Sequence, residues 1–117
     1  MDIQSLLDKL TQNEPIQFAD TMAVIERHFH YNPTAFANGL GNERVFNDAG
    51  ANEGSCKIFA FARHLGLDEN QTLALFGEHY RHVLEHPEGS DHQNIRQFMR
   101  HGWAGIEFAG EPLTSRQ

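Results

Sequence analysis

The 117-residue sequence has one cysteine, only two lysines and no long apolar run. With Cys56 alone, the chain can form neither an internal disulfide nor a metal site built from several cysteines. No apolar run approaches the roughly 20 residues that span a bilayer, so we expect no membrane-spanning segment. The start of the chain also lacks the basic and then apolar segments that form a secretory signal.

Positive charge is scarce, with 9 Lys and Arg against 16 Asp and Glu and a formal net charge of −7. Overall charge of this sign does not favour nucleic acid or anionic membranes, and we expect neither as a partner. Histidine, by contrast, occurs eight times. Because imidazole titrates near pH 6.5, we expect the solubility of the protein to depend on pH.

The remaining composition, with 39% hydrophobic and 21% charged residues, is typical of a soluble globular domain. The length fits one domain, which needs no disulfide to form its core. We expect this domain to span residues 1–109. Residues 110–117 have little apolar content, and we expect a flexible tail there.

Hydrophobic periodicity predicts an α+β fold that is predominantly helical. Apolar residues recur at helical spacing in five segments, namely 2–11, 17–31, 53–65, 69–86 and 90–101. Short segments among turn residues are candidate strands of a small antiparallel sheet, namely 34–37, 44–47 and 106–108. The helix at 53–65 is apolar on most of its faces. We therefore expect four or five helices packed around it as a central buried helix.

Residue types at the helix ends predict where the helices begin and stop. Asn52, Asp68 and Ser90 are candidate N-caps, and the last two have Gln three residues later, as in a capping box. Pro33 ends the second segment, because the residue before a proline is pushed out of helical geometry.

Three sequence blocks resemble a known family. They are PTAFANG at 33–39, NDAGANEGSCKIFAFAR at 47–63, and TLALFGEHYRHVL at 72–84 followed by HPEGSDHQNIRQFMRHGW at 86–103. Together they are similar to the HopJ type III effector family of small Gram-negative bacterial proteins, over roughly residues 17–109. The resemblance implies a virulence protein delivered into a host cell by type III secretion. It supplies no established reaction, substrate or catalytic residue.

Type III signals are usually flexible and serine-rich, whereas residues 1–10 read as a helix with one serine. We therefore expect the protein in the bacterial cytoplasm, with secretion into the host cell as the alternative that the family implies.

The start of the helix at 53–65 carries the first candidate for catalysis. Cys56 lies beside Lys57, and a helix N-terminus favours a thiolate. A histidine brought close by folding, such as His79 or His92, would complete a nucleophile and base. However, Glu53 would raise the pKa of the thiol. Free cysteine is also commonly a small buried hydrophobic residue, which is the competing interpretation.

Histidines provide a second candidate. His79, His82 and His86 are spaced three and four residues apart, so a helix places them on one side. Imidazoles at this spacing can share a metal ion, but a solvated helix face gives the same pattern. We expect no cofactor and no metal, and keep these histidines as the metal-binding alternative.

Asp91 and His92 suggest a general base held in place by a carboxylate, but neighbouring helical residues point about 100° apart. Helix capping by Ser90 explains the same pattern. Arg96 could bind an acidic partner or lie on a salt-bridged surface.

The loop at 38–52 is rich in asparagine and glycine, and long ordered loops are often functional. We expect Asn38, Asn47 and Asn52 to line a binding pocket with the start of the next helix. A buried asparagine network that only holds the backbone in place is the alternative.

The sequence thus favours a protein that acts by binding a partner, a host-cell protein if the chain is exported, with an undetermined oligomeric state. An enzyme with a polar cleft near Glu53 and Cys56 is the alternative, and a histidine metal site is a third reading. An exposed apolar patch around Trp103 or Phe108 would favour partner binding. An open cleft with an accessible Cys56 would favour the enzyme.

Overall fold

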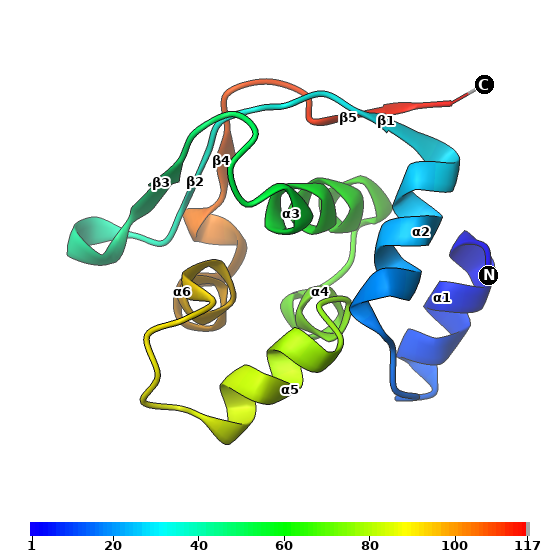
Figure 1. Ribbon diagram of the computed structural model, residues 1–117, viewed down its shortest axis with the longest axis horizontal. Coiled ribbons are helices and arrows are strands. Elements are labelled where there is room, and N and C mark those ends of the chain that lie inside the picture. Colours follow the sequence, from blue (N-terminus) through cyan, green and yellow to red (C-terminus); the bar gives the residue numbers. More distant parts are fainter. Residues whose placement is uncertain (117) are drawn as a thin grey trace.

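The computed structural model describes residues 1–116 (Figure 1). The helices are α1 (Ile3–Thr11), α2 (Phe18–His28), α3 (Glu53–Leu65), α4 (Glu69–Ala74), α5 (Glu78–Glu85) and α6 (Gln93–His101). Short 3-10 helices are η1 (Gly41–Glu43) and η2 (Gly102–Gly105). The strands are β1 (Phe29–Tyr31), β2 (Phe36–Asn38), β3 (Val45–Asn47), β4 (Glu107–Phe108) and β5 (Leu113–Ser115). The predicted class, α+β and predominantly helical, is confirmed.

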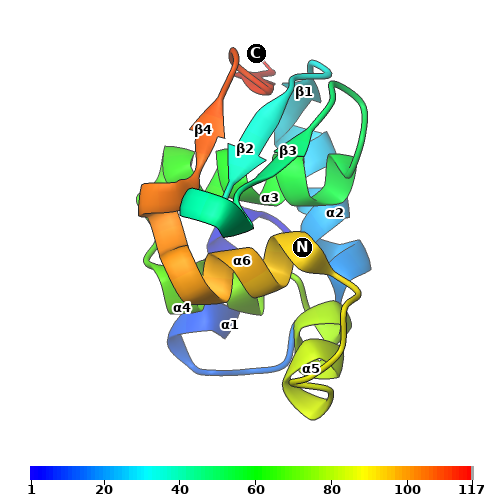
Figure 2. The same ribbon diagram turned by 90° about the vertical axis from the view of Figure 1, so that its left-hand side faces the viewer.

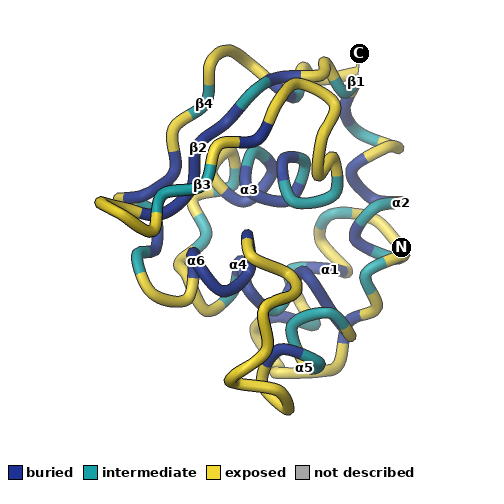
Figure 3. Tube along the Cα trace, turned by 60° about the vertical axis from the view of Figure 1, so that its left-hand side comes forward, coloured by how far each residue is buried: buried dark blue, intermediate teal, exposed yellow. Residues whose placement is uncertain are grey.

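Helix α3 lies at the centre of the fold, with the other helices and the sheet around it, as the sequence predicts (Figures 1 and 3). The Phe59 side chain on α3 is fully buried. Its ring centroid lies 4.9–6.4 Å from four aromatic rings, those of Phe36, Phe76, Phe98 and Trp103. Burying one such ring stabilises the fold by about 1.5–3 kcal/mol. Phe59 therefore joins α3 to β2, α6 and η2 in one core.

A three-stranded antiparallel sheet with the order β3-β2-β4 covers α3 and α6 on one side (Figure 2). Phe36 in the middle strand pairs with Asn47 on one side and with Phe108 on the other. Side chains opposite each other in register share a sheet face, so these three residues belong to the same face. The three predicted strand segments thus form the predicted small sheet.

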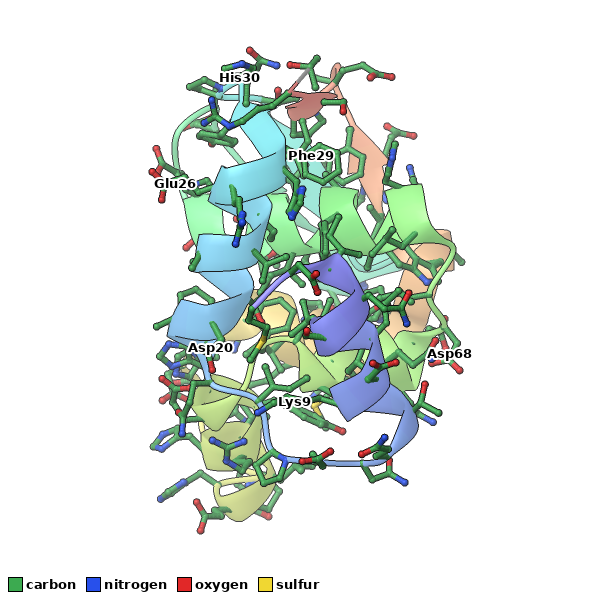
Figure 4. The ribbon with its side chains drawn as sticks, turned by 90° about the vertical axis from the view of Figure 1, so that its right-hand side faces the viewer. Lys9, Asp20, Glu26, Phe29, His30 and Asp68 are labelled. Atoms are coloured by element: carbon green, nitrogen blue, oxygen red, sulfur yellow. The ribbon has the colours of Figure 1, made fainter. Side chains whose placement is uncertain are left out.

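A second, two-stranded sheet joins β1 to β5 and corrects two expectations. The second helix ends at His28 instead of residue 31, and β1 continues from it with Phe29 paired to Ser115. Phe29 packs into the core and His30 lies at the outer end of the molecule (Figure 4). The segment expected as a flexible tail thus supplies β5, and Arg116 Nε donates to the carbonyl of Glu26 at 2.7 Å. Gln117 lies outside the described residues.

The predicted helix at 69–86 is divided into α4 and α5, which is why the described chain has six helices instead of four or five. Gly77 separates them with φ +60° and ψ −128°, a conformation open to glycine. A Cβ at this position would lie 2.5 Å from the backbone nitrogen of Phe18. The Glu78 carboxylate then accepts from that same nitrogen at 2.8 Å. The break lets the chain approach the start of α2 closely.

The predicted helix caps have mixed outcomes. Asp68 and Gln71 form the capping box of α4 as predicted. Ser90, however, does not cap α6, which begins at Gln93 after His92 in the left-handed region at φ 51°. The Gln93 side chain instead donates to the Ser90 carbonyl at 2.7 Å. Asn52 holds the N-cap position of α3, also left-handed, without capping it.

Candidate functional site

Cys56 lies inside the core in the first turns of α3, with a fully buried side chain. Its sulfur is 3.7 Å from the carbonyl oxygen of Thr34, to which the thiol donates. Burial, with a smaller contribution from the Glu53 carboxylate, raises the pKa of Cys56 to about 11. Lys57 opposes this shift but does not reverse it. A buried, protonated thiol is a poor nucleophile, so the geometry argues against catalysis by Cys56.

The asparagines of the long loop form one connected network, which is the alternative that the sequence left open. Asn38 donates to the carbonyl and to the side-chain oxygen of Asn94, at 2.8 and 3.0 Å. Asn94 and Asn52 both donate to the Asn47 side-chain oxygen, at 3.0 and 2.7 Å. Asn38 and Asn47 are buried. The network ties β2, β3, the start of α3 and the start of α6 together, and it offers little surface to a ligand.

Four histidines from α5 and the start of α6 gather on one surface. The rings of His82 and His86 stack with centroids 4.2 Å apart, and those of His79 and His92 lie 5.1 Å apart. His82 Nε2 is 3.0 Å from the Asp91 carboxylate. Within residues 1–116, no group of three or more His, Cys, Asp or Glu side chains has a geometry that could hold a metal ion. The cluster brings the predicted histidines together without supporting a shared metal.

His92 occupies the edge of this cluster and is partly desolvated. Burial lowers the pKa of His92, and the neighbouring His79 and His82 lower it further, whereas Asp91 acts in the opposite direction. A neutral imidazole at this position can accept a proton and so act as a base. However, Cys56 is enclosed in the core, so the predicted nucleophile and base do not form an accessible pair.

Arg96, a predicted binding residue, is 7% exposed and bonded within the chain. Its guanidinium donates to the Asp91 carboxylate at 2.7 Å and to the His86 carbonyl at 2.9 Å. The first of these bonds holds the pKa of the Asp91 carboxyl below its usual range. Arg96 therefore fixes the connection between α5 and α6, a segment that is otherwise exposed (Figure 3).

An apolar groove runs between α5 and α6. It has a volume of about 140 Å³ and is lined by Val83, Leu84, Pro87, Arg96, Met99 and Arg100. Leu84 is 52% exposed and Met99 is 42% exposed. Arg100 forms an ion pair with Glu43, which His101 also contacts at 2.9 Å. We call this feature the α5–α6 groove.

Exposed apolar surface lies only partly at the residues proposed for it, because the exposed Phe46 and the partly buried Phe108 line a further concavity together. Trp103 and Phe108 are only partly exposed, and the Trp103 indole N–H donates to the Leu67 carbonyl at 3.1 Å. The large hydrophobic side chains that are exposed are Met1, Leu40, Phe46, Leu84 and Met99. Leu84 and Met99 both belong to the apolar pattern that predicts their helices, so periodicity does not mark either of them as exposed.

A second concavity, of about 380 Å³, lies between the C-terminal half of α3 and residues 106–113. Arg63 and His64 line it from α3, and Glu107 and Glu111 line it from the other side. None of these four was a candidate from the sequence. The segment 110–113 was expected to be loose, so nothing in the sequence placed a pocket wall there.

Comparisons with known proteins agree with this architecture. A protein-family model described as HopJ type III effector protein matches residues 3–113. The crystal structure of the unknown-function protein VPA0580 is 52% identical, with a TM-score of 0.92. The match covers 99% of this chain and 95% of that one. No curated protein matches the chain. In the described part of the chain, no helix has both the length and the apolar character to cross a membrane.

Proposed function

We propose that this chain, which belongs to the HopJ type III effector protein family, acts by binding a segment of a partner protein. The observation that carries the proposal is the α5–α6 groove. Its Leu84 and Met99 side chains are 52% and 42% exposed on two adjacent helices. Apolar side chains that line a concave surface are typical of protein interaction sites.

The groove also carries charge that suits an acidic residue on the partner. Arg100 lines it and keeps 57% of its side chain exposed, despite its ion pair with Glu43. A guanidinium has five N–H donors, and the contact with Glu43 leaves others free. The complementary segment would insert an apolar side chain between Leu84 and Met99. It would place a carboxylate against Arg100.

The family description supports a particular setting for this binding. In this proposal the protein is made in the bacterial cytoplasm, and type III secretion delivers it into a host cell. The partner there is a host protein, and binding to it serves virulence. The same groove would bind a bacterial protein if the chain is never exported.

Site-specific photo-crosslinking tests the proposal. A photo-reactive amino acid replaces Met99 in the full chain, and in a matched control it replaces Ala23, which is exposed on α2 and does not line the groove. We expect a covalent adduct with one protein from position 99 in bacterial or host-cell extract, and none from position 23. No adduct, or the same adducts from both positions, contradicts the proposal.

The purified partner then provides the quantitative test. Leu84→Lys should weaken its binding by at least about tenfold, which is the range for a buried apolar contact at an interface. Arg100→Gln should also weaken binding, and more so at low ionic strength. Ala23→Lys, on exposed surface of α2, is the control and should leave the affinity unchanged. Equal affinity of the Leu84 variant and the parent would refute this use of the groove.

A further inference from the structure

The pocket of about 380 Å³ between α3 and residues 106–113 is independent of the α5–α6 groove. It lies where the C-terminal half of α3 runs beside β4, as the side view shows (Figure 4). A volume of this size is within the range of small-molecule sites. Its walls differ in charge, because α3 contributes Arg63 and His64 whereas the opposite wall contributes Glu107 and Glu111.

Arg63 is held in place without an ion pair. Its guanidinium carbon lies 5.3 Å from the ring centroid of Trp103 and 5.2 Å from that of Phe108. Its Nη2 donates to the Ile106 carbonyl at 3.4 Å. In residues 1–116, no carboxylate lies within ion-pair distance of Arg63. Arg44, Arg96 and Arg100 each pair with a carboxylate, whereas Arg27, Arg81 and Arg116 resemble Arg63 in forming no ion pair within residues 1–116. The cation is thus fixed by aromatic rings and keeps donors for a ligand.

The pocket wall opposite α3 has two carboxylates, of which one is already in an ion pair and the other is not. Glu107 extends toward solvent with 79% of its side chain exposed and pairs with Arg44 at 3.5 Å. Within residues 1–116, Glu111 forms no ion pair. A simple anion bound to Arg63 would meet the repulsion of this acidic wall. A ligand that also carries a positive group would instead gain from it.

Part of the lining between these charges is apolar. It comes from Ala60, Ile106, Phe108 and Leu113. Leu113 is positioned by the pairing of β5 with β1, and Phe108 by the pairing of β4 with β2. Phe108 and Leu113 are therefore both held by hydrogen-bonded strands, which keeps this part of the pocket preformed.

We propose that this pocket binds a small zwitterion of the amino acid class with an apolar side chain. The ligand carboxylate pairs with the Arg63 guanidinium, for which a planar fork is well suited. The ligand ammonium faces Glu111. The apolar side chain packs against Phe108 and Leu113.

The single tryptophan provides the assay, because Trp103 stacks on Arg63 and its emission responds to a ligand there. The probes are leucine, leucinamide, which lacks the carboxylate, and N-acetylleucine, which lacks the ammonium. Leucine should change the emission in a saturable way, and calorimetry should give the same affinity. Each of the other two probes should bind at least about tenfold more weakly, as expected for a lost charge-assisted contact. Equal binding of all three, or no saturable binding of leucine at millimolar concentration, overturns the proposal.

Two substitutions test which residue binds each charged group of the ligand. Arg63→Gln and Glu111→Gln should each weaken leucine binding by about tenfold or more in calorimetry. Glu111→Gln should in addition improve the binding of N-acetylleucine, because the acidic wall no longer repels its carboxylate. Arg27→Gln, on exposed surface of α2, is the matched control and should leave the affinity unchanged. Leucine binding that either pocket variant leaves unaltered overturns the assignment, and unchanged thermal unfolding shows that the variants remain folded.

Discussion

Cys56 should resist alkylation in the folded protein, and the resistance can be worked out from its surroundings. The side chain is fully buried on α3, and its thiol donates to the Thr34 carbonyl. Burial raises its pKa from 9.0 to about 11. Since only the thiolate attacks an alkylating reagent, both access and ionisation limit the reaction.

Two routes to the alkylated product are available. In the closed structure, a shift of two pKa units reduces the thiolate fraction at neutral pH by about 100-fold, before the lack of access is counted. In the opened chain the thiol has its ordinary pKa, but opening that costs about 5 kcal/mol exposes roughly one molecule in 5,000. Either route makes the reaction at least about 100-fold slower than in the unfolded chain.

Iodoacetamide labelling, followed by intact-protein mass spectrometry, measures this ratio in buffer and in denaturant at the same pH. A chain with Cys56→Ala and Ser90→Cys carries the matched control, because Ser90 is exposed on the α5–α6 connection. The control cysteine should react at nearly the rate of the unfolded chain. Native labelling of Cys56 within tenfold of that rate, or a rate that levels off below about pH 7, would refute the reasoning and restore the nucleophile hypothesis.

Two further predictions concern the backbone and pH. Gly77→Ala should lower the free energy of unfolding by at least about 2 kcal/mol, because its Cβ would lie 2.5 Å from the Phe18 nitrogen at φ +60°. Chemical denaturation measures this, and an unchanged midpoint contradicts it. Burial lowers the pKa of His92, so the unfolded chain takes up this proton first and stability falls as the pH drops below about 6.5. His92→Asn, which tolerates the left-handed conformation, should therefore lose less stability between about pH 7.5 and about pH 5.5 in urea denaturation than the parent, and an equal loss contradicts this.

The parts of the fold that the sequence predicts are those with a strong local pattern. The helix at 53–65 is apolar on most faces, and a helix of that kind has to be central, which the burial of Phe59 confirms. The Asp68 and Gln71 spacing predicts the start of α4 because both halves of a capping box are local. The three short strands could be placed because turn residues separate them on both sides.

The parts that could not be predicted depend on contacts between distant segments. Gly77 looks like a tolerated glycine inside a helix until Phe18 is known to lie against it. Strand β5 has only one apolar residue, Leu113, and its pairing with Phe29–Tyr31 joins segments more than 80 positions apart. Such pairing is set by the tertiary structure and leaves little local signal. The pocket wall at 110–113 was missed for the same reason.

The candidate site raises a related problem, because residue type alone does not separate residues that hold the fold from residues that can bind. Asn38, Asn47 and Arg96 have chemistry suited to a ligand, yet the Asn38 amide nitrogen, both side-chain polar groups of Asn47 and the Arg96 guanidinium are bonded within the chain. A polar group already bonded in a buried position can reach a ligand only if those bonds break, at about 1–3 kcal/mol for each group left unsatisfied. Arg63 has the same chemistry as Arg96 but is positioned mainly by aromatic rings, with one hydrogen bond to the Ile106 carbonyl, so most of its donors remain free. The groups still available to a ligand are unused hydrogen-bond donors and exposed apolar side chains. The binding proposals therefore rest on Arg63 and on the α5–α6 groove.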